Sequence, residues 1–240
     1  MFGKKKRKLD NDSLKNGVGL ITYTDPTSPI SEQFRTARTN IQFSSLNKEI
    51  KSIVFTSSGP SEGKSTVSNN LAVTWAEQGK RVIIVDADLR RPTVHRTFRV
   101  SNKIGLSSLL AGAASVNDAI HQTVINNLYV LTSGPVPPNP SELLGSVQMA
   151  NLLDTLTHNY DIVVVDAPPV NSVTDAQVLS AKTDGTILVV PQNMADKKGV
   201  IRAKSLLEAV HTNILGAIMN RADVNETVGY YGGYYGVDKK

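Results

Sequence analysis

The segment SIVFTSSGPSEGKSTVSNNLAVTWAEQG, residues 52–79, decides how this chain folds. It begins as a short apolar run typical of a buried strand, and it ends as a helical stretch that stops at Gly79. Between the two lies a loop that contains Gly59 and Gly63. A strand, a glycine-bearing loop and a helix in this order are the setting in which a phosphate-binding loop works. The segment therefore predicts an α/β nucleotide-binding fold.

The loop SSGPSEGKST, residues 57–66, is close to the pattern G-x-x-x-x-G-K-[ST]. In such a loop the backbone N–H groups surround phosphates, Lys64 reaches the outer phosphates and Ser65 binds Mg²⁺. Ser58 stands where the pattern has its first glycine; we interpret the loop as a variant, because serine is small. The alternative is a turn that only joins a strand to a helix. The residues expected to bind nucleotide here are Gly59, Pro60, Ser61, Glu62, Gly63, Lys64, Ser65 and Thr66.

Strand-like and helical segments alternate through the rest of the chain. Further apolar strands are expected within 81–88, 127–134, 160–169, 185–192 and 214–221. Helices are expected from Pro29 after an N-cap at Ser28, and over 105–121, 141–157, 173–182 and 197–211. Strands that are apolar on both faces and separated by helices predict a mainly parallel central sheet with helices on both faces, the P-loop NTPase fold.

The chain divides into three parts. Residues 1–19 have no apolar periodicity and are expected to be disordered, residues 20–225 form one domain, and residues 226–240 are a flexible tyrosine-rich tail. Inside the domain, residues 134–144 (GPVPPNPSELL) predict a proline-rich loop near the site, followed by a helix that Ser141 caps.

Charge and composition exclude several classes of protein. The net charge is +5, but the run at residues 4–8 supplies five of the 26 basic residues, and the remaining 21 match the 21 acidic ones. No nucleic-acid partner is therefore expected; the run is either a solvated terminus or lies near an anionic membrane. The absence of cysteine excludes a disulfide framework and a thiolate metal site. With no apolar run of about 18 residues, the chain is expected to be soluble and cytoplasmic.

Three carboxylates follow apolar strands. VIIVDADLRRP places Asp86 and Asp88 at the end of one strand, and IVVVDAPP places Asp166 at the end of another. The ends of parallel strands meet at one edge of a sheet, where ligands bind. A single such aspartate can equally cap a helix, but three of them beside a phosphate loop predict a Mg²⁺–nucleotide site.

Together these motifs resemble the bacterial tyrosine kinases of the P-loop type, which are linked to capsule and exopolysaccharide synthesis. The aliphatic-D-x-D-x-R pattern is matched by residues 83–90, and the aliphatic-D-x-x-P pattern by residues 163–169. The resemblance implies a protein-tyrosine kinase that uses ATP and Mg²⁺. It implies catalytic roles for Lys64, Asp86, Asp88 and Arg90 and metal binding by Ser65, Asp88 and Asp166. Asp86 is the expected base, although Asp86 and Asp88 could exchange roles, and Arg90 either stabilises charge or forms a structural salt bridge.

The same resemblance extends to three further segments. Asn220 and Arg221 are expected to contact adenine, or else form an ordinary turn. Glu32, Arg35 and Arg38, in EQFRTAR, mark the subunit interface of a ring-shaped oligomer such as an octamer; the alternative is an intrahelical ion pair. The tail residues Tyr230, Tyr231, Tyr234 and Tyr235 are the expected autophosphorylation sites, in trans within the oligomer.

Family members of this type depend on partners. The resemblance implies a separate transmembrane activator that regulates polysaccharide chain length and brings the kinase to the inner face of the membrane, and a cognate tyrosine phosphatase. One alternative is a partition or division-site ATPase that acts as an assembly switch, but its extra loop lysine is missing between Ser58 and Glu62. Another is a non-catalytic assembly module with an adhesive aromatic tail.

Overall fold

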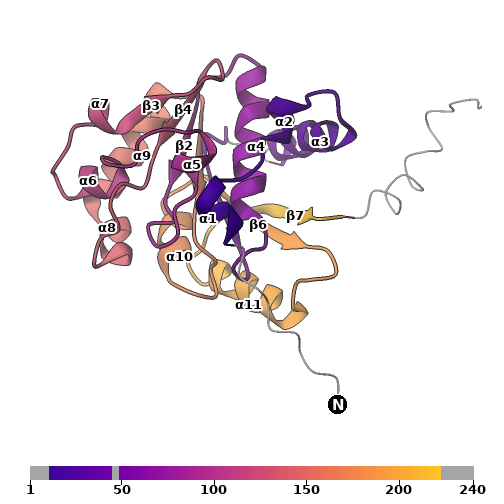
Figure 1. Cartoon of the computed structure of the whole chain (residues 1–240). Coiled ribbons are helices and arrows are strands. Elements are labelled where there is room, and N and C mark those ends of the chain that lie inside the picture. The colour runs from indigo at the N-terminus through magenta and orange to yellow at the C-terminus, as the bar shows by residue number, and fades with distance from the viewer. Residues whose placement is uncertain (1–10, 45–48, 223–240) are drawn as a thin grey trace, which may run out of the picture.

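The predicted strands form one sheet, and its order places the phosphate loop near the centre. A computed structural model describes residues 11–44 and 49–222 of the 240. Within these residues the sheet has seven strands in the order β3-β4-β2-β5-β1-β6-β7 (Figure 1). Neighbouring strands are parallel except for β3 and β4. The strands are β1 (Ser52–Ser57), β2 (Val82–Asp86), β3 (Ile120–Gln122), β4 (Leu128–Leu131), β5 (Ile162–Asp166), β6 (Gly185–Pro191) and β7 (Ile214–Asn220).

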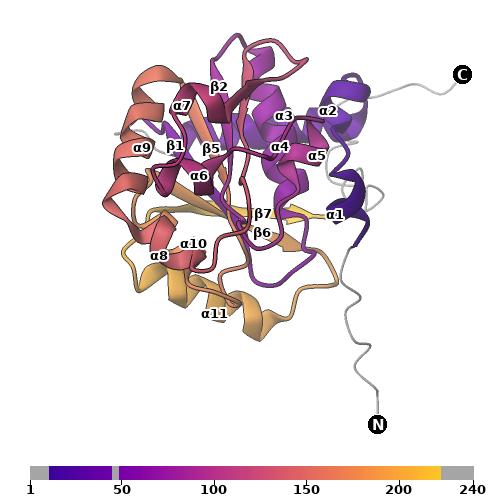
Figure 2. The same ribbon diagram turned by 60° about the vertical axis from the view of Figure 1, so that its left-hand side comes forward.

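Alternate side chains of the strands pack into two cores, one on each face of the sheet. In β1, Ile53 and Phe55 contact one layer and Val54 contacts the other. The first layer holds α3 (Pro29–Phe43), α4 (Lys64–Glu77) and α5 (Val94–Thr97). The second holds α6 (Leu106–Leu110), α7 (Val116–Ala119), α8 (Pro140–Gly145), α9 (Val147–Asn159), α10 (Asp175–Ser180) and α11 (Lys197–Glu208). Figure 2 shows the sheet between these layers. The predicted α/β fold, with helices on both faces, is confirmed.

Two helix predictions need correction. The helix expected over 105–121 is α6, then α7, then the antiparallel strand β3. Gly112 follows α6 with a positive φ of 72°, and Ser115 begins α7 through a capping box with Asp118. The helix expected over 141–157 breaks at Ser146, which follows α8 and caps α9. Two different residues, Gly112 and Ser115, separate α6 from α7, whereas Ser146 alone ends α8 and starts α9.

The caps predicted at the helix starts have different outcomes. Ser28 caps α3, because its hydroxyl accepts a hydrogen bond from the backbone N–H of Ser31 at 3.2 Å. Ser141 does not cap α8: Asn139 holds the N-cap position, Pro140 is the first helical residue, and the Ser141 hydroxyl donates to Asp175 instead. The prediction at Ser141 was therefore wrong by two positions.

The start of the described chain also differs from expectation. Part of the segment expected to be disordered, residues 11–19, contains the helix α1 (Asp12–Asn16) and is followed by α2 (Ile21–Thr24). The basic run at 4–8 and the tail tyrosines lie outside the described residues. None of the helices that the structure describes is long and apolar enough to cross a membrane.

Candidate active site

The central strands bring the predicted carboxylates to one edge of the sheet. Asp86, the last residue of β2, lies opposite Asp166, the last residue of β5, in the parallel ladder. β1 runs along the other side of β5, with Phe55 opposite Asp166, and leads directly into the phosphate loop. The sheet order therefore places two aspartates beside Lys64 although they are far apart in the sequence.

Lys64 is at the centre of this cluster. Its Nζ atom lies 2.9 Å from Oδ2 of Asp88 and 3.4 Å from Oδ1 of Asp166. It also donates a hydrogen bond to the Ser65 hydroxyl at 3.2 Å. The Lys64 side chain is only 12% exposed, so its charge depends on these partners more than on water.

The buried charges shift one another's pKa values. Burial alone would lower the pKa of Lys64, but Asp166 and Asp88 outweigh it and hold that pKa above its usual value. Burial raises the pKa of Asp166 despite the nearby ammonium. Burial, with Asp166 and Asp88 adding to it, raises the pKa of Asp86 to about 8. One ammonium therefore does not balance three carboxylates, and the cluster favours additional positive charge.

Asp86 is held by the backbone at the start of a short helix. Its Oδ2 atom accepts backbone hydrogen bonds from Thr93 at 3.2 Å and Val94 at 3.0 Å, where α5 begins. Its Oδ1 atom is buried and has no hydrogen-bond partner in the described part of the chain. The carboxylate is thus fixed in orientation through one oxygen, and its other oxygen is buried without a hydrogen-bond partner among the described residues.

The contacts of the phosphate loop explain why it has Ser58 where the common pattern has glycine. The Ser58 hydroxyl donates to the buried carboxylate of Glu62, at 3.0 Å to Oε1 and 2.9 Å to Oε2. Gly63 has a φ of 94°, and a Cβ atom there would lie 1.9 Å from Nδ2 of Asn220. That nitrogen donates to the Glu62 carbonyl at 3.0 Å. The loop is therefore fixed from inside by Ser58 and from outside by the end of β7.

A cleft of about 240 Å³ lies over this cluster. Among its lining residues are most of those predicted from the sequence: Pro60, Ser61, Gly63, Lys64, Ser65, Thr66, Asp88, Asn220 and Arg221. Gly59 and Glu62 are instead turned into the protein, where Gly59 accepts a hydrogen bond from the Ser57 hydroxyl. Ser13, Leu14 and Val18 also line the cleft, and sequence reasoning missed them because their segment has no periodicity.

The predicted metal ligands fit Mg²⁺ but do not form a closed cage. No group of three or more acidic or histidine side chains with metal-binding geometry occurs among residues 11–44 and 49–222. Mg²⁺ usually takes only one or two protein carboxylates and completes its shell with water and phosphate oxygens. Asp88, Asp166 and the Ser65 hydroxyl surround Lys64, in a cluster with excess negative charge. This donor set suits a magnesium ion that arrives with phosphates.

Arg90 is part of a separate ion pair. Its Nε donates to Oδ2 of Asp175 at 3.0 Å, and its Nη2 donates to Oδ1 at 3.3 Å and to Ser141 at 3.2 Å. Asp175, at the start of α10, is completely buried. In this structure Arg90 therefore makes the structural salt bridge that the sequence left open, and Asp175 is a partner that no motif indicated.

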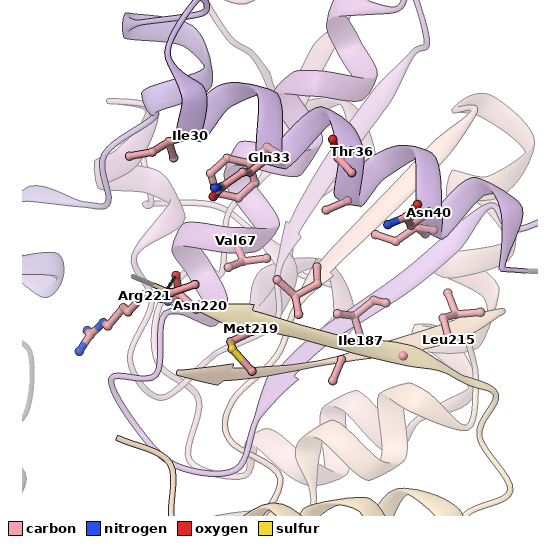
Figure 3. Close-up of a pocket in the computed structure, with 17 residues that line it drawn as sticks. Ile30, Gln33, Thr36, Asn40, Val67, Ile187, Leu215, Met219, Asn220 and Arg221 are labelled. Carbon is pink, nitrogen blue, oxygen red and sulfur yellow. Dashed lines mark hydrogen bonds between the residues drawn. The ribbon is translucent and has the colours of Figure 1, made fainter. Parts of the chain in front are cut away.

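A second, apolar groove of about 490 Å³ begins at Asn220 and Arg221, which also line the first cleft. Figure 3 shows Asn220 and Arg221 at one end, with β7 along one side and α3 along the other. Arg221 reaches back to the loop and donates to the Ser61 carbonyl at 3.2 Å. Both predicted adenine-contacting residues thus lie beside the phosphate loop.

The three residues of EQFRTAR do not share one exposed stripe. Arg35 pairs with Glu32 at 3.0 Å and with Glu77 at 3.6 Å near the surface. Arg38 is buried and donates to the Thr74 carbonyl of α4 at 2.7 Å. The intrahelical pair is therefore present, and Arg38 fastens α3 to α4.

Comparisons with known proteins show what the whole chain is similar to. A family model described as AAA domain matches residues 50–219. Tyrosine-protein kinase YwqD of Bacillus subtilis (strain 168) is 45% identical over 217 residues, which cover 90% of this chain and 91% of that protein. The putative tyrosine-protein kinase CapB of Staphylococcus aureus is 42% identical over 219 residues, with 91% and 96% covered. Among solved structures, the kinase domain of Escherichia coli tyrosine kinase ETK matches with a TM-score of 0.81 and 34% identity, over 88% of this chain and 84% of that one.

Proposed function

This chain belongs to the bacterial tyrosine-protein kinases, and we propose that it phosphorylates tyrosines of its own C-terminal segment with ATP and Mg²⁺ and so regulates capsular or extracellular polysaccharide synthesis. Its fold and its relatives establish nucleotide binding and tyrosine kinase activity. The relatives also decide against the partition-ATPase and assembly-module alternatives. The observation that carries the proposal is the contact of Lys64 with Asp88 and Asp166, which joins the phosphate loop to the acidic strand ends.

Phosphoryl transfer needs positioning and charge neutralisation more than covalent chemistry from the protein. We assign Lys64 to the β- and γ-phosphates, where its ammonium exchanges carboxylate partners for phosphate oxygens. Ser65, Asp88 and Asp166 would hold Mg²⁺, which neutralises phosphate charge when bound. The backbone N–H groups at the start of α4 would bind the phosphates, as helix N-termini do.

Asp86 suits the role of base. A tyrosine hydroxyl has a pKa of about 10, so it is a weak nucleophile without a nearby proton acceptor. The unpaired Oδ1 atom of Asp86 can accept that proton, while α5 fixes the other oxygen. Its pKa of about 8 lies near neutral pH, and a general base is most effective when its pKa is close to the working pH. Asp88, which lines the cleft, is the other candidate.

The proposed acceptors are Tyr230, Tyr231, Tyr234 and Tyr235, which lie outside the described residues. In the reaction a tyrosine oxygen forms a bond to the γ-phosphorus, the bond to the β-phosphate bridging oxygen breaks, ADP leaves, and the tyrosine proton passes to the carboxylate. Each phosphate adds about −1.5 to −2 charge. A modified tail would then be repelled by the acidic cluster and would leave the site free.

The direct test is phosphotyrosine mapping of the purified protein after incubation with Mg·ATP and the cytoplasmic segment of its activator. Phosphate should appear on the tail, and a variant with all four tail tyrosines changed to phenylalanine should hydrolyse ATP but gain no phosphotyrosine there. To test transfer in trans, a Lys64→Met chain with an intact tail is mixed with the all-phenylalanine chain. Phosphate on the Lys64→Met chain supports transfer between subunits; ATP hydrolysis with no phosphotyrosine on any chain would refute the proposal.

The assembly is also a proposal. A ring-shaped homo-oligomer would use Glu32 and Arg35, which lie near the surface of α3, while Arg38 would act indirectly by holding α3 on α4. A separate transmembrane activator would recruit the kinase to the inner face of the membrane, and a tyrosine phosphatase would reverse the modification. Light scattering of Glu32→Gln and Arg35→Gln variants tests the interface: an unchanged mass for both would remove these residues from it.

A further inference from the structure

The segment at residues 11–19 is attached to the helix that supports Asp86. Its backbone is fixed at two points: Arg96 donates to the Lys15 carbonyl at 3.2 Å, and the Val18 N–H donates to the Thr97 hydroxyl at 3.0 Å. Asn11 accepts a hydrogen bond from Arg91 at 3.4 Å. Both views of the ribbon place α1 beside α5 (Figures 1 and 2).

The other end of the segment is attached to α4, the helix that follows the phosphate loop. Nδ2 of Asn70 donates to the Gly19 carbonyl at 2.9 Å, and Oδ1 of Asn70 accepts from the Thr22 N–H at 3.0 Å. Thr22 and Asn70 are both completely buried. The segment thus lies between two helices of the site and is connected to each.

The position of residues 11–19 against α5 requires a glycine at residue 17. Its φ is 78°, in the region that favours glycine, and a Cβ atom there would lie 2.4 Å from the backbone nitrogen of Thr97. The obstructing atoms belong to backbone and cannot rotate away. Gly19 offers a contrast, because a Cβ atom added there meets nothing within 4 Å. A methyl group should therefore displace the segment at Gly17 and leave it in place at Gly19.

Three residues of the docked segment, Ser13, Leu14 and Val18, line the same cleft as Lys64 and Asp88. Leu14 and Val18 are partly buried, and their aliphatic side chains give the cleft an apolar wall beside its charged floor. A nucleotide has this division too, with charged phosphates and less polar sugar and base surfaces. Covering those surfaces removes apolar area from water and strengthens binding.

We propose that residues 13–18 are a nucleotide-binding element, in which Leu14 and Val18 cover the sugar or base of a nucleoside di- or triphosphate bound at Lys64. The element is part of the binding site before any phosphoryl transfer occurs. The proposal requires the nucleotide binding that the fold establishes and does not require the tail to be the acceptor, so the two ideas can fail separately.

The test compares Gly17→Ala with Gly19→Ala in the full-length chain, with ADP as the probe and titration calorimetry as the measurement. Gly17→Ala should weaken ADP binding about tenfold, which corresponds to about 1.4 kcal/mol. Gly19→Ala should stay within about twofold of the parent, because it makes the same chemical change without the backbone overlap. Hydrogen exchange should show residues 13–18 exposed in Gly17→Ala, and protected further by ADP in the parent.

Two results would overturn the proposal. Equal ADP affinity of the two variants, with residues 13–18 displaced in Gly17→Ala, would show that the segment does not contact nucleotide. Tighter binding by Gly17→Ala would show that the segment obstructs the cleft.

A Leu14→Ser, Val18→Ser double variant decides the question if Gly17→Ala stays docked or fails to fold. It keeps the backbone contacts and should still weaken ADP binding about fivefold or more. Unchanged affinity would reject the proposal. If ADP binding weakens as expected but the parent forms no phosphotyrosine, the proposed kinase reaction fails and the binding element stands.

Discussion

Two ion-pair clusters arise from the same short motif, VDADLR, and they differ in how completely they are paired. Asp86 and Asp88 join Lys64 and Asp166 in the acidic cluster, which holds one ammonium and three carboxylates. Two residues further on, Arg90 leaves that cluster and pairs with Asp175 through two hydrogen bonds. The Arg90–Asp175 cluster has equal charges, and each carboxylate oxygen has a donor.

This difference in pairing distinguishes a ligand-binding site, the acidic cluster, from a structural ion pair, the Arg90–Asp175 cluster. In the acidic cluster the pKa values of Asp86 and Asp166 are raised, and one oxygen of Asp86 has no partner within the described chain. Such a cluster lowers the stability of the empty protein and is completed by a cation or a proton. The Arg90–Asp175 cluster needs no ligand, since it joins the loop after β2 to α10 by itself. Paired substitutions can test this contrast.

The largest effect is expected from Lys64→Met, which removes the ammonium from the acidic cluster. The rate of tail phosphorylation should fall about 10³-fold, because a preorganised charge at developing phosphate charge contributes this much. Arg90→Met makes a matched change in the other cluster and should retain measurable activity at low temperature, where the protein stays folded. Both are measured by phosphotyrosine formation under single-turnover conditions; equal losses would place Arg90 at the reacting phosphate and end the contrast.

The next effect concerns Asp86→Asn. Phosphotyrosine formation should fall about 10²-fold, since a general base contributes at least this factor. Stability should change in the opposite direction. The folded pKa of Asp86 is about 8, against 3.8 for an ordinary aspartate, so between these values the folded state holds a proton that the unfolded state has lost. Rising pH therefore destabilises the parent across this window, and the amide, which does not titrate, removes that loss.

The measurement is urea unfolding of the parent and of Asp86→Asn at about pH 5 and about pH 8. The stabilisation by the amide should be larger at the higher pH. Asp175→Asn is the control from the other cluster, and it should lower stability at both pH values because it breaks a complete ion pair. If Asp86→Asn also loses stability at pH 8, the carboxylate is compensated in the folded state and the acidic cluster is not short of positive charge.

A smaller effect is expected from Arg90→Gln. Removing one partner of a buried ion pair costs about 3–5 kcal/mol, but the Arg90 side chain is 39% exposed, so about 2 kcal/mol of unfolding free energy is expected. The KM for ATP should change little, because Arg90 is held away from Lys64 by Asp175. Thermal unfolding and steady-state kinetics of the same preparation separate the two effects. A raised KM with unchanged stability would show that Arg90 leaves Asp175 to bind substrate.

Local patterns predicted most of the fold and the floor of the site. Strand positions followed from runs of valine and isoleucine, and Lys64, Asp86, Asp88 and Asp166 followed from their places after those strands. Sheet order then brings together what the sequence separates, as the opposition of Asp86 and Asp166 shows. A rule that ligands bind at the carboxyl edge of parallel strands was enough to anticipate this.

Sequence reasoning failed where a contact depends on partners far along the chain. Nothing in the sequence around Asp175 indicates that it pairs with Arg90. Ser141 is a residue type that often caps helices, but its hydroxyl donates to the same aspartate instead. Residues 11–19 have no periodicity, because their position is set by backbone contacts with Thr97 and Asn70 rather than by an apolar face. Such contacts leave no local pattern to detect.

The smallest effect is expected from Ser58→Gly, which restores the common loop pattern next to the acidic cluster. The substitution removes a hydrogen bond to Glu62, so the free energy of unfolding should fall by about 1 kcal/mol. ADP affinity should stay within about threefold, because the hydroxyl points at Glu62 and Ser58 does not line the cleft. Urea unfolding and calorimetry measure the two quantities. A tenfold loss of ADP affinity would instead show that Ser58 helps to bind the phosphates. The Ser58–Glu62 contact would then belong with the acidic cluster, which a ligand completes, and not with fully paired contacts such as Arg90–Asp175.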